Sequence, residues 1–349
     1  MAYQGKHSAK AVAEKKGNQS RSKGKPLLVV AIVLLILIIL FSVGTIIVQG
    51  KLNKIKRADD NTIIPPSEVV DEVDPEDEID PENKPPEVDD SEVVWEDIEE
   101  LENDNLINIL LVGQDSRTGK RERSDTMIVL SINPDTGEVS MISFMRDLYV
   151  QMPEGYMDNR MNAAYQLGGF PYLYEVLEKN FGLKCAGGFE VNFDGFTQVV
   201  DAVGGVDVEL TSAEARIVGD GAVVGMNHLN GTQALAYSRI RKIDSDFNRT
   251  SRQRTVVMAL FDRIKGSDVN TLIDLTNTLL PMMTTDLTNS QILSLVMKLA
   301  PKLSGMKIES YRIPVDGGYY DATIRGMMVL VPYLEKNREQ LKTYLPYSE

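Results

Sequence analysis

Residues 126–147 read TMIVLSINPDTGEVSMISFMRD. Two apolar runs flank the turn sequence Pro134-Asp135-Thr136-Gly137, a combination typical of a β-hairpin. Pairing across that turn sets Asp125 opposite Arg146 or Asp147. The sequence therefore predicts a charged cluster at the open end of the hairpin.

On both sides of this predicted hairpin, further strands and helices are intermixed along the chain. LINILLVG (106–113) has the pattern of a buried strand, and strands are also expected at 189–194, 206–210 and 307–314. Helical patterns cover 161–169, 169–182, 196–205, 229–241, 249–266, 271–280, 287–300 and 332–344. This mixture predicts an α/β (mixed α+β) fold, with a central β-sheet covered by helices.

The N-terminal part is typical of a membrane anchor. Residues 1–26 carry a net charge of +6, and residues 27–48 (LLVVAIVLLILIILFSVGTIIV) contain no charge. As a helix this run would be about 33 Å long, against a hydrocarbon core of about 30 Å. Four more basic residues lie in 51–57. We therefore expect a cytoplasmic basic tail (1–26), one transmembrane helix (27–48) and an extracellular remainder at the cell membrane.

An acidic stretch follows the predicted anchor. Residues 59–104 hold 21 Asp and Glu, one Lys and six prolines. Such a segment buries little apolar surface, so residues 49–104 are interpreted as an extended extracellular linker, with an acidic docking tail as the alternative. Order is expected to begin near Val93, Val94, Trp95 and Ile98. Residues 105–349 then form the extracellular domain.

Composition excludes several classes of site. The one cysteine, Cys185, rules out an internal disulfide, a CxxC redox pair and a thiolate zinc site. With two histidines in the chain, a Ser-His-Asp triad would depend on His228. Both residues are interpreted as loop or packing residues. No helix-turn-helix signal precedes residue 27, and 26 residues are too few for one, which argues against a nucleic-acid partner.

Arginines gather at two places in the domain. Five lie between residues 117 and 160 (Arg117, Arg121, Arg123, Arg146 and Arg160), and five lie between 239 and 254. Arginine binds phosphate oxygens with two donors at once. Asp115 and Asp125 end one strand and begin the next, where paired carboxylates and phosphate oxygens would suit Mg²⁺. The alternative is that both aspartates cap turns and pair with arginine.

The second cluster lies at the start of a helix. On the 3.6-residue period, Arg249, Arg252 and Gln253 share a face with the apolar residues of that helix. Buried cations need a carboxylate or an anionic ligand, and Asp244 and Asp246 are candidate internal partners. Arg239 and Arg241 would share a face if their segment is extended, and would diverge on a continuous helix.

Several of these segments together resemble the LytR-CpsA-Psr family. They are LLVGQDSRTGKRERSDTMIVLSINPDTGEVSMISFMRDLYV, RMNAAYQLGG, NFDGFTQVVDAVGGVDVEL and LNGTQALAYSRIRKIDSDFNRTSRQR. The resemblance implies a membrane-anchored phosphotransferase that moves a glycopolymer from polyprenyl diphosphate to peptidoglycan and forms a phosphodiester. Teichoic acid and capsular or secondary wall polysaccharide are the implied cargoes. It also implies an apolar groove for the lipid and a Gram-positive cell wall.

The resemblance assigns roles to particular residues. Metal-associated aspartates match Asp115 and Asp125, which would hold Mg²⁺ or Mn²⁺. Asp125, Arg123 and Arg146 are the implied catalytic residues, and Asp125 or Asp147 would accept the proton of the acceptor hydroxyl. The implied diphosphate-binding residues are Arg117, Arg123, Arg146, Arg160, Arg239, Arg241, Arg249 and Gln253. SFMRD stands where the family often has SIPRD, so a proline is missing before Arg146.

Two other functions stay open at this point. A polyprenyl diphosphate phosphohydrolase would use the same arginines and metal, with water in place of the sugar acceptor. A non-catalytic lipid-binding regulator, or transcriptional attenuator, is the second alternative. It predicts that Asp125→Asn and Arg146→Ala leave the cellular role intact.

Overall fold

The structure, a computed structural model, describes a large part of the chain. The described residues are 52–58, 62–69, 84–95, 101, 105–114, 121–240, 251–253, 255–256, 259–260, 263, 277, 280–299, 301–302 and 306–347. None of the helices in this part is both long and apolar enough to cross a membrane. The predicted anchor at 27–48 lies outside the described residues.

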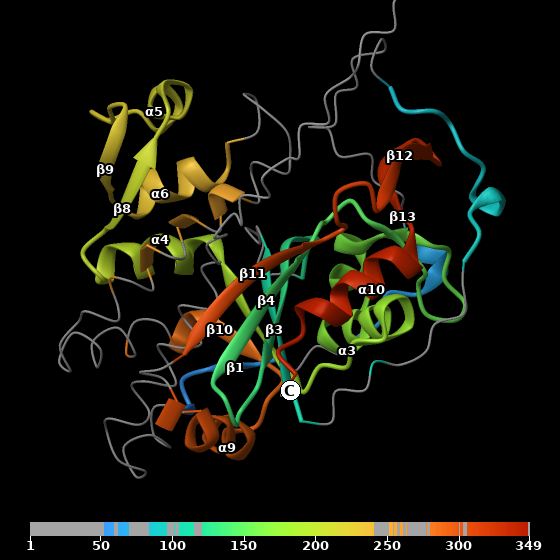
Figure 1. Cartoon of the computed structure of the whole chain (residues 1–349), viewed down its shortest axis with the longest axis horizontal. Helices are drawn as coiled ribbons and strands as arrows, with labels where there is room; N and C mark the ends of the chain where they lie inside the picture. The colour runs from blue at the N-terminus through green and yellow to red at the C-terminus, as the bar shows by residue number, and fades with distance from the viewer. Residues whose placement is uncertain are drawn as a thin grey trace, which may run out of the picture.

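A mixed seven-stranded sheet forms the centre of the domain (Figure 1), as the sequence predicts. Its strand order is β1-β10-β7-β2-β3-β4-β11. The strands are β1 (Lys56–Arg57), β2 (Ile107–Gln114), β3 (Ser124–Ile132), β4 (Glu138–Phe144), β7 (Gly187–Asn192), β10 (Met283–Thr285) and β11 (Lys307–Ile313). β2–β3, β3–β4 and β10–β7 are antiparallel pairs, and β2–β7, β1–β10 and β4–β11 are parallel pairs.

Helices cover both faces of this sheet (Figure 1). Successive residues of a strand point to opposite faces, so Ile109 and Leu111 join one apolar cluster while Leu110 and Val112 join the other. On the second face lie α3 (Met161–Phe181) and α10 (Leu334–Tyr344). The first face packs against α4 (Phe193–Ala202), α6 (Gly231–Ser238) and α9 (Asn289–Leu299).

Smaller elements extend from these layers. Three two-stranded ribbons are β5 (Tyr149–Val150) with β6 (Asn159–Arg160), β8 (Val206–Leu210) with β9 (Gly225–Leu229), and β12 (Tyr319–Ile324) with β13 (Met327–Pro332). The other short helices are α5 (Ser212–Val218), η1 (Pro66–Glu68), η2 (Asp90–Glu92) and η3 (Leu280–Met282). The elements α5, β9 and the β12–β13 ribbon were not predicted from the sequence. Residues 251–253, 255–256, 259–260 and 263 are helical, as predicted.

The helices predicted over 161–169 and 169–182 are the two halves of α3. Gly168 and Gly169 leave helical geometry and divide the helix there, and Gly169 has a φ of 65°. The Arg121 Nε donates to the Gln166 carbonyl, 3.0 Å away, at the end of the first half. This arginine of the first cluster therefore holds a helix end. The helix predicted over 229–241 ends at Ser238, with Arg239 as its cap.

Parts of the predicted linker lie against the domain. Leu52 and Ile55 are buried in the core before β1 begins. The Ile64 amide donates to the Leu167 carbonyl at 2.8 Å. Val93 is buried in a third apolar cluster with β12 and β13. Residues 52–58 and 62–69 contradict the expectation of an extended spacer, because their few apolar residues find neighbours on the domain, whereas Val93 lies where order was expected to begin.

Candidate functional site

The β3–β4 hairpin brings the predicted charges together at its open end. Met127 pairs with Phe144 in the antiparallel register, and continuing that register sets Asp125 opposite Arg146. The Arg146 Nη1 donates to the Asp125 Oδ1 over 3.2 Å. The predicted neighbourhood of these two residues is confirmed.

Two further charges extend this pair into a network. The Arg146 Nε lies 3.3 Å from the Asp147 Oδ2, and the Arg160 Nη1 lies 3.5 Å from the Asp147 Oδ1. Arg146 is 6% exposed and Arg160 is 1% exposed. Cations buried to this degree need anionic partners, and here carboxylates and guanidinium groups alternate in space. We call Asp125, Arg146, Asp147 and Arg160 the charge network.

The N-terminus of α3 is fixed to the same turn. The Met161 amide donates to the Leu148 carbonyl at 2.7 Å, and the Asn162 amide donates to the Arg146 carbonyl at 3.1 Å. These bonds satisfy two of the amides that a helix N-terminus leaves open. Arg160 caps the helix, and it pairs with Tyr149 between β6 and β5. The position of Arg160 is thus set by backbone contacts on both sides.

Arg123 lines a pocket beside this helix. The other lining residues are Ile64, Glu68, Val69, Asn159, Ala163, Gln166 and Leu167. Its volume is about 130 Å³, somewhat below the roughly 150 Å³ cavity that holds benzene in another protein. The pocket therefore suits a diphosphate headgroup rather than a polyprenyl chain. The apolar groove expected for the lipid stays a prediction.

Gln253 reaches the site from the second arginine cluster. The Thr126 Oγ1 donates to the Gln253 Oε1 at 3.4 Å, one residue from Asp125. Its neighbour Arg252 is buried and donates through Nε to the Glu214 Oε1 at 2.7 Å. The predicted inward face of this helix is confirmed at Arg252. Its partner is Glu214 of α5, whereas Asp244 and Asp246 lie outside the described residues.

Burial alone would raise the pKa of Glu214, but hydrogen bonds from Arg252 and Thr211 outweigh it and lower that pKa below 4.5. Glu214 therefore stays ionised beside Arg252 at neutral pH. Through its hydrogen bond with Arg252, the ionised Glu214 holds in place the helix that also carries Gln253.

The other predicted site residues are not all brought together. Arg239 is exposed directly after α6. Asp115, Arg117, Arg241 and Arg249 lie outside the described residues. Gln114, which precedes Asp115, pairs with Ser124, which precedes Asp125. Within the described part of the chain, no group of three or more His, Cys, Asp or Glu residues is arranged to hold a metal ion.

A polar cluster that was not predicted from the sequence lies beside this strand end. The Gln114 Nε2 donates to the Glu190 Oε1, and the Tyr165 hydroxyl donates to the Glu190 Oε2 at 2.8 Å. The Gln114 Oε1 accepts from the Glu122 amide at 2.8 Å, which ties together the two ends of the segment carrying Asp115. Burial, and secondarily Glu190, raises the pKa of the Tyr165 hydroxyl, so it remains a donor.

The two residues interpreted as packing residues have local partners. The His228 Nδ1 lies 2.7 Å from the Asp207 Oδ1, and its Nε2 lies 2.7 Å from the Gly204 carbonyl. Cys185 packs against the second core cluster, where burial raises the pKa of its thiol. Neither residue contacts the charge network.

Comparison with known proteins gives one consistent family. The chain is 37% identical over 229 residues to a polyisoprenyl-teichoic acid–peptidoglycan teichoic acid transferase TagU from Oceanobacillus iheyensis, covering 62% of this chain and 71% of that protein. It is 34% identical to the TagU of Bacillus mycoides, covering 60% and 69%.

Solved structures agree with this relationship. TagV of B. subtilis has 28% identity and a TM-score of 0.55, covering 71% of this chain and 100% of that one. TagT bound to LIIa-WTA has 25% identity and a TM-score of 0.57, covering 72% and 95%. The LytR_cpsA_psr family profile matches residues 69–343, which hold the charge network and every strand of the central sheet except β1, so the chain belongs to the LytR_cpsA_psr family.

Proposed function

We propose that this protein is a membrane-anchored phosphotransferase that moves a glycopolymer from polyprenyl diphosphate to peptidoglycan and forms a phosphodiester. Teichoic acid is the first candidate cargo because the TagU relatives are named for it, and capsular or secondary wall polysaccharide is the second. The charge network is the observation that carries the proposal. It presents two buried arginines at one strand end, where diphosphate oxygens would be bound.

In this proposal the arginines bind and orient the donor. Arg146 and Arg160 are held in place by Asp147, whose two oxygens face one arginine each. Arg123, in the adjoining pocket, would bind the same diphosphate. Charge builds up on the bridging oxygen as the phosphoryl group leaves the carrier, and fixed guanidinium groups stabilise that charge. Asp125 is the more exposed of the two carboxylates, at 26% against 19% for Asp147, so we assign the proton of the acceptor hydroxyl to Asp125.

The chemistry of these donors also fits a divalent cation. Asp125 is partly exposed at the strand end and, with Asp115, would offer the one or two carboxylates that Mg²⁺ uses beside phosphate oxygens. Bound there, Mg²⁺ (or Mn²⁺) would neutralise charge on the diphosphate. Residues 27–48 would anchor the protein with its N-terminus in the cytoplasm and residues 105–349 outside.

The test is a transfer reaction with the full chain in detergent micelles. The protein is incubated with Mg²⁺, a polyprenyl diphosphate-linked saccharide and peptidoglycan oligomers, and the products are analysed by mass spectrometry. We expect a saccharide-phosphate adduct on peptidoglycan. Arg146→Ala and Asp125→Asn should abolish the adduct, while Arg216→Ala, an exposed arginine on α5, should leave it unchanged. Released saccharide phosphate without an adduct would instead establish the phosphohydrolase.

A further inference from the structure

One part of the acidic stretch is built into the domain. Residues 84–95 run beside β12, where the Val88 amide donates to the Thr323 carbonyl at 3.0 Å and the Thr323 amide donates to the Pro86 carbonyl at 2.8 Å. We call residues 84–95 the acidic strap. Its Val93 is buried beneath it, so the strap has both backbone and side-chain attachment to the domain.

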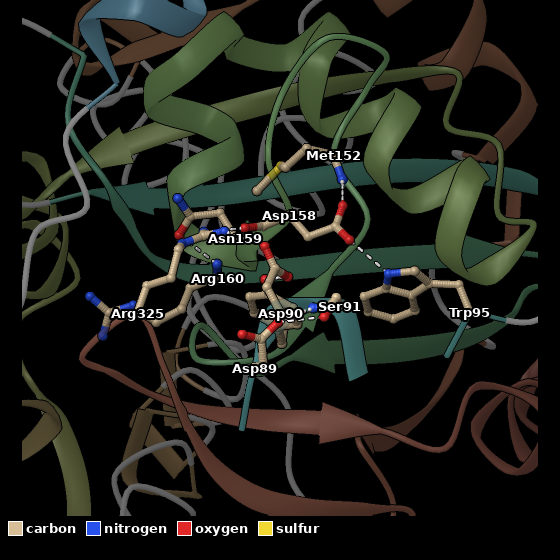
Figure 2. Close-up of polar contacts among 10 residues, drawn as sticks. Asp89, Asp90, Ser91, Trp95, Met152, Asp158, Asn159, Arg160 and Arg325 are labelled. Carbon is tan, nitrogen blue, oxygen red and sulfur yellow. Dashed lines mark hydrogen bonds and ion pairs between the residues drawn. The ribbon is translucent and has the colours of Figure 1, made fainter. Parts of the chain in front are cut away.

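The carboxylate of Asp90 lies at the centre of a polar junction (Figure 2). Its Oδ2 is 2.7 Å from the Arg325 Nη1, and its Oδ1 accepts from the Tyr149 hydroxyl. The Arg325 Nη2 in turn donates to the backbone carbonyl of Asp158. A single strap residue therefore contacts, directly or through one guanidinium group, three separate segments of the domain.

Trp95 makes a second attachment to the same turn (Figure 2). Its indole Nε1 donates to the Asp158 Oδ2 at 2.7 Å, while the Met152 amide donates to the Asp158 Oδ1 at 3.1 Å. The Trp95 ring also stacks on the Tyr149 ring, with 6.0 Å between centroids. Asp158 is thus held at its carbonyl and at both carboxylate oxygens.

This junction leads directly to the candidate site. Asn159, which lines the pocket with Arg123, and Arg160, of the charge network, follow Asp158 in sequence. Tyr149, which binds Asp90, is the β-pair partner of Arg160. The strap contacts Tyr149 of β5 and Asp158, the residue directly before β6, and this ribbon presents the two site residues.

Arg325 occupies a position where its backbone is unfavourable. It has a φ of 48°, and Gly326 after it has a φ of 78°. A hairpin turn with two positive φ angles favours Asn or Gly at its first position, because an ordinary side chain there costs about 1 kcal/mol or more. The turn carries an arginine instead, and its guanidinium group joins Asp90 to Asp158. The contacts of the arginine side chain, rather than the backbone conformation, therefore account for the presence of arginine at this position.

We propose that Asp90 is a positioning residue for the candidate site: through Arg325 and Tyr149 it holds the Asp158–Arg160 turn so that Asn159 and Arg160 face the diphosphate. The inference rests on the proposed function for the identity of the ligand. It makes Asp90, a residue of the acidic stretch, a support of the phosphate-binding residues.

The first test needs no ligand. Hydrogen exchange is measured by mass spectrometry on the full chain in detergent micelles, in peptides that cover 153–162. Asp90→Asn should accelerate exchange there at least tenfold, since the turn loses its charged attachment. Asp89→Asn is the matched control, because the Asp89 carboxylate contacts the neighbouring Ser91 on the surface of the strap. Equal exchange in wild type and Asp90→Asn would overturn the inference.

The second test measures binding of farnesyl diphosphate, a short polyprenyl diphosphate, by calorimetry. Asp90→Asn should weaken binding on the order of tenfold, as loss of an orienting partner does at other sites. Asp90→Glu should restore most of the affinity, and Asp89→Asn should leave it unchanged. Unaltered affinity in a correctly folded Asp90→Asn would refute the positioning role. If the wild type binds farnesyl diphosphate but transfers no saccharide phosphate, the result counts against the proposed function alone. The hydrogen-exchange result would then still decide whether Asp90 positions the site.

Discussion

Replacing Glu214 by Gln should destabilise the protein by about 3 kcal/mol at neutral pH, the lower end of what breaking a buried ion pair costs. The carboxylate uses both oxygens: Oε1 accepts from Arg252 at 2.7 Å, and Oε2 accepts from the Thr211 amide and hydroxyl at 2.8 Å each. A glutamine amide turns one acceptor into a donor that faces another donor. Arg252 keeps the Ile240 carbonyl at 3.0 Å, which limits the loss.

The pH dependence gives the effect a definite sign. The folded-state pKa of Glu214 lies below 4.5, so its charge contributes stability above that pH, and the contribution disappears as the pH falls through the folded-state pKa. Gln does not titrate. The difference in the free energy of unfolding between wild type and Glu214→Gln should therefore be largest near pH 7 and shrink steadily below pH 4.5.

The measurement is urea unfolding of the full chain in detergent micelles across this pH range. Glu209→Gln is the matched control, because Glu209 is exposed on β8 in the same part of the domain. It should change the stability by less than about 0.5 kcal/mol. A loss below about 1 kcal/mol for Glu214→Gln, or a loss that persists unchanged in acid, would refute the argument that the ionised carboxylate holds Arg252.

Three further substitutions test the site and its support. Arg146→Lys should lower transfer at least about 100-fold in the mass-spectrometric assay, because an ammonium group cannot match a guanidinium that spans two carboxylates; activity within tenfold of wild type would contradict this. Gly169→Ala should cost about 1–2 kcal/mol in urea unfolding, since φ is 65° and the added Cβ would lie 3.1 Å from the Arg121 Nη1. Asn180→Leu should cost about 3 kcal/mol, because the buried side chain of Asn180 makes three hydrogen bonds to backbone groups; a neutral result would show that these bonds add little.

Local patterns made the hairpin and one half of the charge network predictable. Turn residues at 134–137 and period-two alternation define the register, and the register alone brings Asp125 to Arg146. The helical period likewise predicted that Arg252 faces inward. These inferences need no knowledge of distant segments, and the structure confirms each of them.

Partners that are far apart in sequence were not predictable in this way. Arg252 lies 38 residues from Glu214, and the sequence offered the nearer Asp244 and Asp246 as equally good partners. Gln114 and Glu190 meet because β2 and β7 are parallel neighbours, a fact about topology that neither segment reveals. Which polar groups meet across such distances in sequence depends on the assembled fold.

The acidic strap shows why composition can mislead about a single residue. Summed over residues 59–104, the charge indicates a chain that cannot form a core of its own, and that physical argument is sound. It says nothing about whether such a chain can add to an existing core. Thr323 offers a β-bridge partner to the strap backbone, Arg325 offers a cation to Asp90, and Asp158 accepts a hydrogen bond from Trp95. A highly charged segment beside a folded domain is therefore better judged by the individual contacts that the domain offers than by its mean hydropathy.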